Sequence, residues 1–128
     1  MLLNIDKELS QALDQNGAFY AFSKAQFDEK AQPHTKYSNL PSGLLCPSDN
    51  ASKLLKEFDS IHEKGVKQVL LDKTPRQIIW HELGNYECQI AYNYSDAVDA
   101  VKMYGITEAD VKAVWPDFID HCNKHNLY

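Results

Sequence analysis

Apolar residues recur at spacings of three and four over most of the chain, a pattern that is typical of amphipathic helices. Two such stripes lie in the first part of the sequence. The first predicts a helix over residues 2–16, and Gly17 follows where a left-handed residue commonly ends a helix. The second begins at Ser48 and predicts the longest helix, through Leu54, Leu55, Phe58, Ile61, Val66, Val69 and Leu70.

The stretch 74–94 predicts a central helix with a well-defined start. Thr74 is a good N-cap, Pro75 suits the first helical position, and Gln77 completes a capping-box pattern. A continuous helix here places four residues on one core-facing arc: Ile79, Leu83, Tyr86 and Ile90.

Two further helices are predicted near the end of the chain. Ser95 begins a short helix before Gly105, and Thr107 caps the last one. Pro116 lies within the last apolar stripe, so we expect a kink or a break near Trp115.

The remaining segments contain the expected irregular and extended structure. An aromatic run at 18–22 reads as extended, Ser23 caps a short helix whose Phe27 returns to the aromatic cluster, and the prolines and glycine of 31–48 favour an irregular segment. The fold class is therefore mainly α: a single domain over residues 1–128, built as a compact bundle of five or six helices. A small two-stranded β element is expected near residues 18–22 and 43–46.

Composition excludes several classes of function. The chain has 13 basic and 18 acidic residues, a net charge of -5, and scattered lysines, so direct nucleic-acid binding is not expected. Three cysteines without a CxxC pair suggest neither a disulfide framework nor a zinc knuckle. Without a leader or a long apolar segment, we expect a cytoplasmic protein of a bacterial host cell, with no cofactor and no membrane contact.

The central helix carries the densest set of polar side chains. His81 and Glu82 match the start of an HExxH zinc motif, but Asn85 stands where the second imidazole is needed. On a continuous helix Glu82 and Glu87 diverge, with Glu87 near Trp80, so a hydrogen-bonded polar stripe is favoured over an active site. As an alternative, a small hydrolase or metal-dependent enzyme would gather Glu82, Asn85 and Glu87 with side chains from residues 31–48.

His121 and His125 lie one helical turn apart and could offer two imidazoles to a transition metal. Cys122 points toward the core stripe, so a third ligand would have to come from elsewhere, such as His34 or His62. No metal site is therefore predicted, and this pair is kept as the alternative.

Four segments carry a resemblance to a known family: GAFYAFSKAQF at 17–27, SGLLCP at 42–47, HELGNYE at 81–87 and YGITEADVKAVWP at 104–116. Together they resemble a family of small uncharacterised bacterial and phage proteins, in the same order over nearly the whole chain. The family's middle motif reads ELxNHE, and Tyr86 here replaces its histidine. The resemblance implies a phage or mobile-element origin, and it implies no activity.

These observations favour a non-enzymatic protein-binding module that inhibits a host defence system, such as a CRISPR nuclease. The partner is expected to be a protein, and the chain itself either a monomer or a homodimer that pairs through the long helix or residues 123–128. Since aromatic side chains outside a core carry much of the binding energy of interfaces, the predicted partner-binding residues are Tyr37, Trp80, Glu87, Tyr92 and Tyr94. Trp80 lies off the core arc, so it is either covered by a second helix or available for binding.

Overall fold

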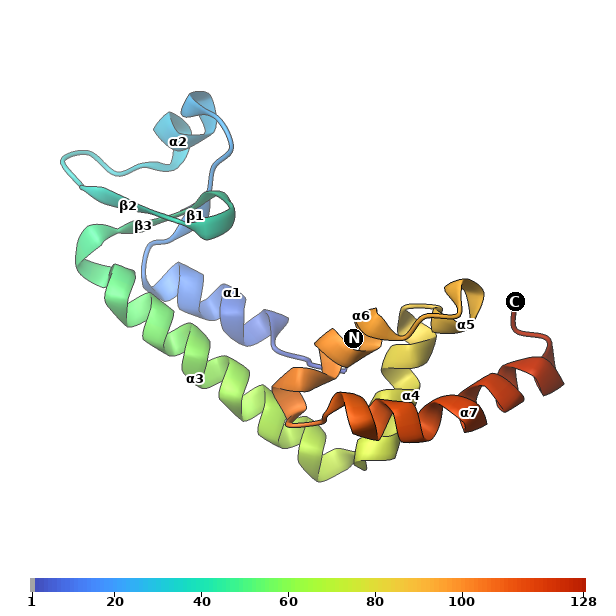
Figure 1. Ribbon diagram of the computed structural model, residues 1–128. Coiled ribbons are helices and arrows are strands. Elements are labelled where there is room, and N and C mark those ends of the chain that lie inside the picture. The colour runs from blue at the N-terminus through green and yellow to red at the C-terminus, as the bar shows by residue number, and fades with distance from the viewer. Residues whose placement is uncertain (1) are drawn as a thin grey trace. The chain divides into compact units, whose positions relative to one another are not determined.

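The computed structural model describes residues 2–128, whose elements are grouped in two compact units (Figure 1). The N-terminal unit is Asn4–Lys64. The C-terminal unit consists of Gly65–Tyr128 together with Leu2 and Leu3. The fold is mainly α with a small β element, as predicted. The expectation of a single domain stays a prediction, and each unit is described by itself.

The N-terminal unit combines helices with a small antiparallel sheet. Its elements are α1 (Asp6–Gln15), β1 (Phe19–Tyr20), α2 (Lys24–Lys30), β2 (Tyr37–Leu40), the 3-10 turn η1 (Pro41–Gly43), β3 (Leu44–Pro47) and the first part of α3 (Ser48–Asp72). The strand order is β1-β3-β2, and Leu45 pairs with Phe19 on one side and Asn39 on the other. Figure 1 shows this sheet beside α2.

The predicted pairing of β1 with β3 is confirmed, but the sheet also has a third strand in the segment expected to be irregular. The prolines that suggested irregular structure, Pro33, Pro41 and Pro47, lie before, after or opposite β2 rather than inside it. Ser42 and Gly43 have φ values of 66° and 78°, which close the turn between β2 and β3. The prolines of this segment therefore lie outside β2 and do not prevent it from pairing with β3.

The core of the N-terminal unit is small and partly aromatic. Its buried residues are Ala12, Ala18, Leu44, Cys46 and Leu54, with Leu13, Leu40, Ala51, Phe58 and Ile61 packed against them. Beside it, the ring of Tyr37 lies 5.4 Å from that of Phe19 and 5.5 Å from that of Phe27, between ring centroids. The predicted return of Phe27 to the aromatic cluster is confirmed.

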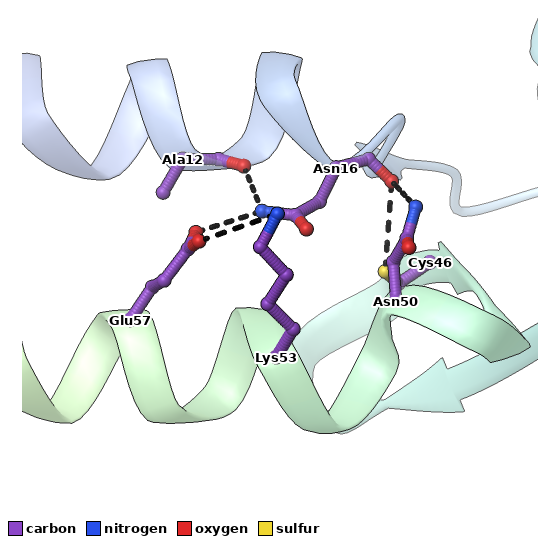
Figure 2. Close-up of polar contacts among 6 residues, drawn as sticks. All are labelled: Ala12, Asn16, Cys46, Asn50, Lys53 and Glu57. Carbon is purple, nitrogen blue, oxygen red and sulfur yellow. Dashed lines mark hydrogen bonds and ion pairs between the residues drawn. The ribbon is translucent and has the colours of Figure 1, made fainter.

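A buried polar residue, Asn16, fastens α1 to α3 within this unit (Figure 2). It is 1% exposed, and its Nδ2 donates to the Ala12 carbonyl and to Glu57 Oε2, both at 2.8 Å. Its own backbone carbonyl accepts from Asn50 Nδ2 at 3.1 Å and from the Cys46 thiol at 3.9 Å. Burial raises the pKa of the Cys46 thiol, so the sulfur stays protonated and donates.

The C-terminal unit is helical and is built around α4. Its elements are the end of α3, α4 (Pro75–Asn85), α5 (Cys88–Ala91), α6 (Ser95–Val101), the 3-10 turn η2 (Lys102–Tyr104) and α7 (Glu108–His125). Helix α4 contacts α5, α6 and α7 (Figure 1). The fully buried side chains of this unit are Ile78, Ile79, Leu83, Val101, Val111, Cys88 and Cys122. Within residues 2–128 no helix is both long enough and apolar enough to cross a bilayer.

The predicted helix starts of this unit are confirmed at two positions. Thr74 and Gln77 form a reciprocal capping box, and Thr107 and Asp110 form another. The predicted break at Pro116 is wrong, since α7 runs through it as one helix. Pro116 and Lys112 are both exposed, so water can bond the Lys112 carbonyl that lacks its helical donor.

Candidate functional site

The central helix is shorter than the sequence pattern predicts. Helix α4 ends at Asn85, because Glu87 adopts a left-handed conformation with φ 49°, and α5 starts anew at Cys88. As a result Tyr86 is 47% exposed and Ile90 is 57% exposed, so the predicted core arc is wrong in its second half. The buried face of α4 is instead formed by Ile78, Ile79, Glu82 and Leu83.

Two left-handed residues bracket the short helix α5. Glu87 precedes it with φ 49° and ψ 45°, and Tyr92 follows it with φ 52° and ψ 45°. A non-glycine residue in this region is disfavoured by about 1–2 kcal/mol. Such strain persists where the surrounding structure enforces it, and it is concentrated at binding and catalytic sites. Both residues are among those predicted to bind a partner.

Aromatic rings from α4, α7 and the α5–α6 connection form a continuous group, which we call the aromatic row. Its members are Trp80, Tyr92, Tyr94, Trp115, Phe118 and His121. Trp115 lies 5.4 Å from Tyr92, 5.2 Å from Tyr94 and 6.2 Å from Phe118, between ring centroids. Phe118 is buried, whereas Tyr92 is 69% exposed. The row therefore extends from the core to the surface.

Trp80 is half-buried, and α7 covers part of its ring. Its centroid lies 5.2 Å from that of Phe118 and 5.3 Å from that of His121. The guanidinium carbon of Arg76 lies 5.3 Å from the ring centroid, and Arg76 also forms an ion pair with Asp117 at 3.2 Å. Both alternatives for Trp80 thus apply in part, since a second helix covers it and the remainder faces a cleft.

That cleft, the α4–α7 cleft, has a volume of about 540 Å³. It is lined by Trp80, His81, Gly84, Asn85, Glu87, Gln89, Phe118, His121, Cys122 and Leu127. Gln89 donates from Nε2 to the Leu127 carbonyl at 2.8 Å, whereas its buried Oε1 has no hydrogen-bond partner within residues 2–128. The cleft thus combines an aromatic wall with unused acceptor groups, an arrangement suited to binding a polar group.

The residues of the alternative active site are divided between two environments. Glu82 is 6% exposed and accepts from Asn85 Nδ2 at 3.4 Å. Burial raises the pKa of Tyr104, and the charge of Glu82 raises it further, which places this carboxylate near η2. Asn85 and Glu87 line the α4–α7 cleft, and Glu82 does not. The two carboxylates therefore do not converge there for acid–base chemistry.

His121 and His125 lie together, with ring centroids 4.4 Å apart. Cys122 beside them is fully buried, and burial raises the pKa of its thiol, which disfavours the thiolate that binds metals. Within the described part of the chain no three histidine, cysteine, aspartate or glutamate side chains are placed to hold a metal ion. The pair offers two imidazole ligands.

Tyr37, the remaining predicted partner-binding residue, belongs to the N-terminal unit and is half-buried. Its ring contacts the rings of Phe19 and Phe27, and its hydroxyl oxygen accepts a hydrogen bond from the Gln32 backbone amide at 2.9 Å. These contacts give Tyr37 a structural role. It is not part of the aromatic row.

Sequence reasoning missed three contributors to this surface: Gln89, Trp115 and Leu127. By its spacing Trp115 belongs to the apolar stripe of α7, yet it is half-buried at the edge of that stripe, where an aromatic ring can border solvent. For Gln89 and Leu127 the sequence holds no signal, since their contact joins residues 38 positions apart.

Comparison with known proteins identifies a family. A family model described as "Family of unknown function (DUF7659)" matches residues 2–121, which include α4 and all of the aromatic row. No curated protein and no solved structure matches the chain. Since the family model covers far more than half of the sequence, the chain belongs to this family of unknown function, DUF7659.

Proposed function

We propose that this protein is a protein-binding module whose partner docks on the aromatic row and the α4–α7 cleft. The observation that carries the proposal is Tyr92, which is 69% exposed, has φ 52°, and contacts Trp115. Tyrosine and tryptophan contribute large shares of binding energy where they are partly exposed on a supported surface. Tyr92 ends α5 in the left-handed conformation, and its backbone N–H donates to the Cys88 carbonyl, which holds the ring at a fixed place on the surface.

The net charge of the chain favours a partner with a basic surface. The two carboxylates beside the aromatic row do not add to this argument, because Asp117 is paired with Arg76 at 3.2 Å and Asp120 with Lys124 at 3.0 Å. The net charge of the chain is -5. Opposite charges steer association and help to select a partner.

The proposal extends to origin and target. The four motif segments resemble phage and bacterial proteins, which supports an origin in a phage or mobile element. A partner with a basic surface is consistent with an enzyme that handles nucleic acids, and we therefore propose a bacterial defence nuclease as the target, inhibited in the host cytoplasm. If a defence nuclease is the target, expression of the protein should restore plaque formation by a phage that the nuclease restricts.

Affinity capture with matched variants tests protein binding. Wild-type protein, Tyr92→Ala and Phe22→Ala are immobilised and exposed to bacterial lysate, and bound proteins are quantified. We expect Tyr92→Ala to lower the amount of captured partner about tenfold, because loss of a central aromatic contact weakens binding by 1.4 kcal/mol or more. Phe22, which is 76% exposed in the N-terminal unit, serves as the matched aromatic control and should leave capture unchanged.

Two outcomes contradict the proposal. One is the absence of any protein that wild-type captures above an empty matrix. The other is equal loss of capture in Tyr92→Ala and Phe22→Ala, which would place the binding surface elsewhere or show nonspecific adsorption. Far-UV circular dichroism on each variant confirms that the helices are retained before capture is compared.

A further inference from the structure

We propose that the α4–α7 cleft receives an arginine side chain of the partner, with its guanidinium group bound by Glu87 and by neighbouring amide oxygens. This inference rests on the proposed function, because it names the chemistry that the partner presents to the same face. An arginine side chain fits the cleft because of the charge of the lining residues, their hydrogen-bonding groups and the aromatic wall.

Glu87 is the only carboxylate among the lining residues within 2–128. The lining contains no lysine or arginine, and its other ionisable side chains are His81, His121 and Cys122. Glu87 is exposed, and no ion pair of its carboxylate is found in the described chain. A negative group that has no internal counter-ion favours a cationic ligand.

Two side-chain amides of the cleft already use a donor within the molecule. Gln89 uses its Nε2 to hold the Leu127 carbonyl, which leaves Oε1 buried and unpaired. Asn85 uses Nδ2 to reach Glu82, which leaves Oδ1 as its remaining acceptor. Glu87 and Asn85 are exposed, so a ligand reaches their oxygens directly, whereas Gln89 Oε1 has almost no accessible surface and accepts from a ligand only if its side chain turns toward the cleft. An unpaired acceptor is unfavourable, which favours such a turn when a ligand supplies donors.

These groups fit arginine better than lysine. A guanidinium group presents five N–H donors in a planar fork and is weakly hydrated, whereas an ammonium group is compact and strongly hydrated. The Glu87 carboxylate and the Asn85 Oδ1 can use the fork directly, and Gln89 Oε1 can use it after its side chain turns. The apolar stem of the arginine would lie along Trp80, Phe118 and Leu127, which supply the apolar part of the lining.

The molecule already shows that the Trp80 ring accepts a guanidinium group. The guanidinium carbon of Arg76 lies 5.3 Å from the ring centroid, and Asp117 holds Arg76 through an ion pair. Arg76 is not part of the cleft lining. The partner's arginine would thus be a second guanidinium group beside the same indole, with Glu87 in the role that Asp117 has for Arg76.

A small probe tests this inference without the partner. Nα-acetyl-arginine amide is titrated into 15N-labelled full-length protein, and the signals of the Trp80 indole and the Asn85 and Gln89 side-chain amides are followed. We expect saturable shifts at these three groups. Nα-acetyl-norleucine amide, which keeps an apolar stem and lacks the charge, should give none, and Nα-acetyl-lysine amide should bind more weakly than the arginine probe.

Variants assign the interaction to Glu87. Glu87→Gln keeps the size of the side chain and removes its charge, and it should weaken arginine-amide binding about tenfold. Glu108→Gln, which removes an exposed carboxylate outside the cleft lining, is the matched control and should bind as wild type. If Glu87→Gln fails to fold, the comparison of the arginine and norleucine probes on wild-type protein still decides the question.

The outcomes separate this inference from the proposed function. Absence of saturable shifts, equal shifts with the norleucine probe, or unchanged affinity in Glu87→Gln would overturn the arginine assignment. If that happens while Tyr92→Ala still lowers capture, protein binding stands and only the occupant of the cleft is wrong. If the probe binds through Glu87 but no protein is captured, the cleft recognises guanidinium groups and the partner proposal fails.

Discussion

The two units of this protein use polar side chains in opposite ways. In the N-terminal unit Asn16 is 1% exposed and bonds to Ala12, Asn50 and Glu57 of the same unit, and its Oδ1, which has no partner within residues 2–128, is closed off from solvent. In the C-terminal unit Asn85, Glu87 and Gln89 line an open cleft and keep acceptors unused. A polar side chain that is closed off from solvent serves the fold, whereas exposed polar side chains beside a cleft are within reach of a ligand.

The aromatic side chains differ in the same sense. Phe19, Phe27 and Tyr37 form a closed trio beside the sheet of the N-terminal unit. The aromatic row of the C-terminal unit instead leads outward, from buried Phe118 to Tyr92. Cluster size therefore does not separate structural from binding aromatics. The proposed binding role of the row rests instead on the exposure of Tyr92, its outermost ring.

The largest expected effects come from truncating one core residue in each unit. Leu54 and Leu83 are both 0% exposed, and replacing either by alanine should lower the free energy of unfolding by about 2–5 kcal/mol. Urea unfolding is followed by far-UV circular dichroism and by tryptophan fluorescence, whose sources Trp80 and Trp115 are both in the C-terminal unit. If the chain is the predicted single domain, both probes shift together in both variants.

The control for this experiment is Leu71→Ala. Leu71 is 80% exposed, so its truncation should change the free energy of unfolding by less than about 0.5 kcal/mol. A Leu54→Ala protein whose fluorescence transition stays at the wild-type urea concentration, while part of the circular dichroism signal is lost earlier, would show that the two units unfold separately. The single-domain prediction would then be wrong.

A smaller effect is expected at Asn16. Asn16→Ala removes the bonds to the Ala12 carbonyl and to Glu57 but keeps the backbone carbonyl that accepts from Asn50. The free energy of unfolding should fall by about 2–3 kcal/mol, since two hydrogen bonds and some packing are lost. Urea unfolding measures it, with exposed Asn4→Ala as control.

The same variant sharpens the contrast between the units. If Asn16 serves the fold alone, folded Asn16→Ala protein binds the arginine probe with wild-type affinity. Weakened probe binding by folded Asn16→Ala would show that the N-terminal polar junction also contributes to recognition, and the proposed division between the units would not hold.

Local signals in the sequence were sufficient for much of the fold. Capping residues act over three or four positions, so Thr74, Gln77 and Thr107 could be assigned directly. Gly17 and Gly105 were correctly placed as helix stops, because both adopt positive φ. The apolar spacing also predicted the mainly α class and the central position of α4.

The candidate site could be predicted only in part, for two physical reasons. Trp80, Asn85, Glu87, Tyr92 and Tyr94 were identified from the sequence, but the end of α4 was not, because the left-handed residue there is glutamate and carries no glycine signal. The cleft itself depends on tertiary contacts between α4, α5 and the end of the chain, including the bond from Gln89 to Leu127. Helical periodicity does not encode such contacts.

The smallest effect is expected at the strained backbone of Glu87, where stability and binding should change in opposite directions. Glycine adopts φ 49° without the clash of a β-carbon, although it loses more entropy on folding. Glu87→Gly should therefore raise the free energy of unfolding by about 0.5–1 kcal/mol while it weakens binding of the arginine probe about tenfold. Ser42→Gly, at φ 66° in the N-terminal unit, is the matched control and should gain stability without any change in probe binding. A Glu87→Gly protein that is less stable than wild type would show that this side chain holds the fold together, and strain at Glu87 would no longer support a binding role.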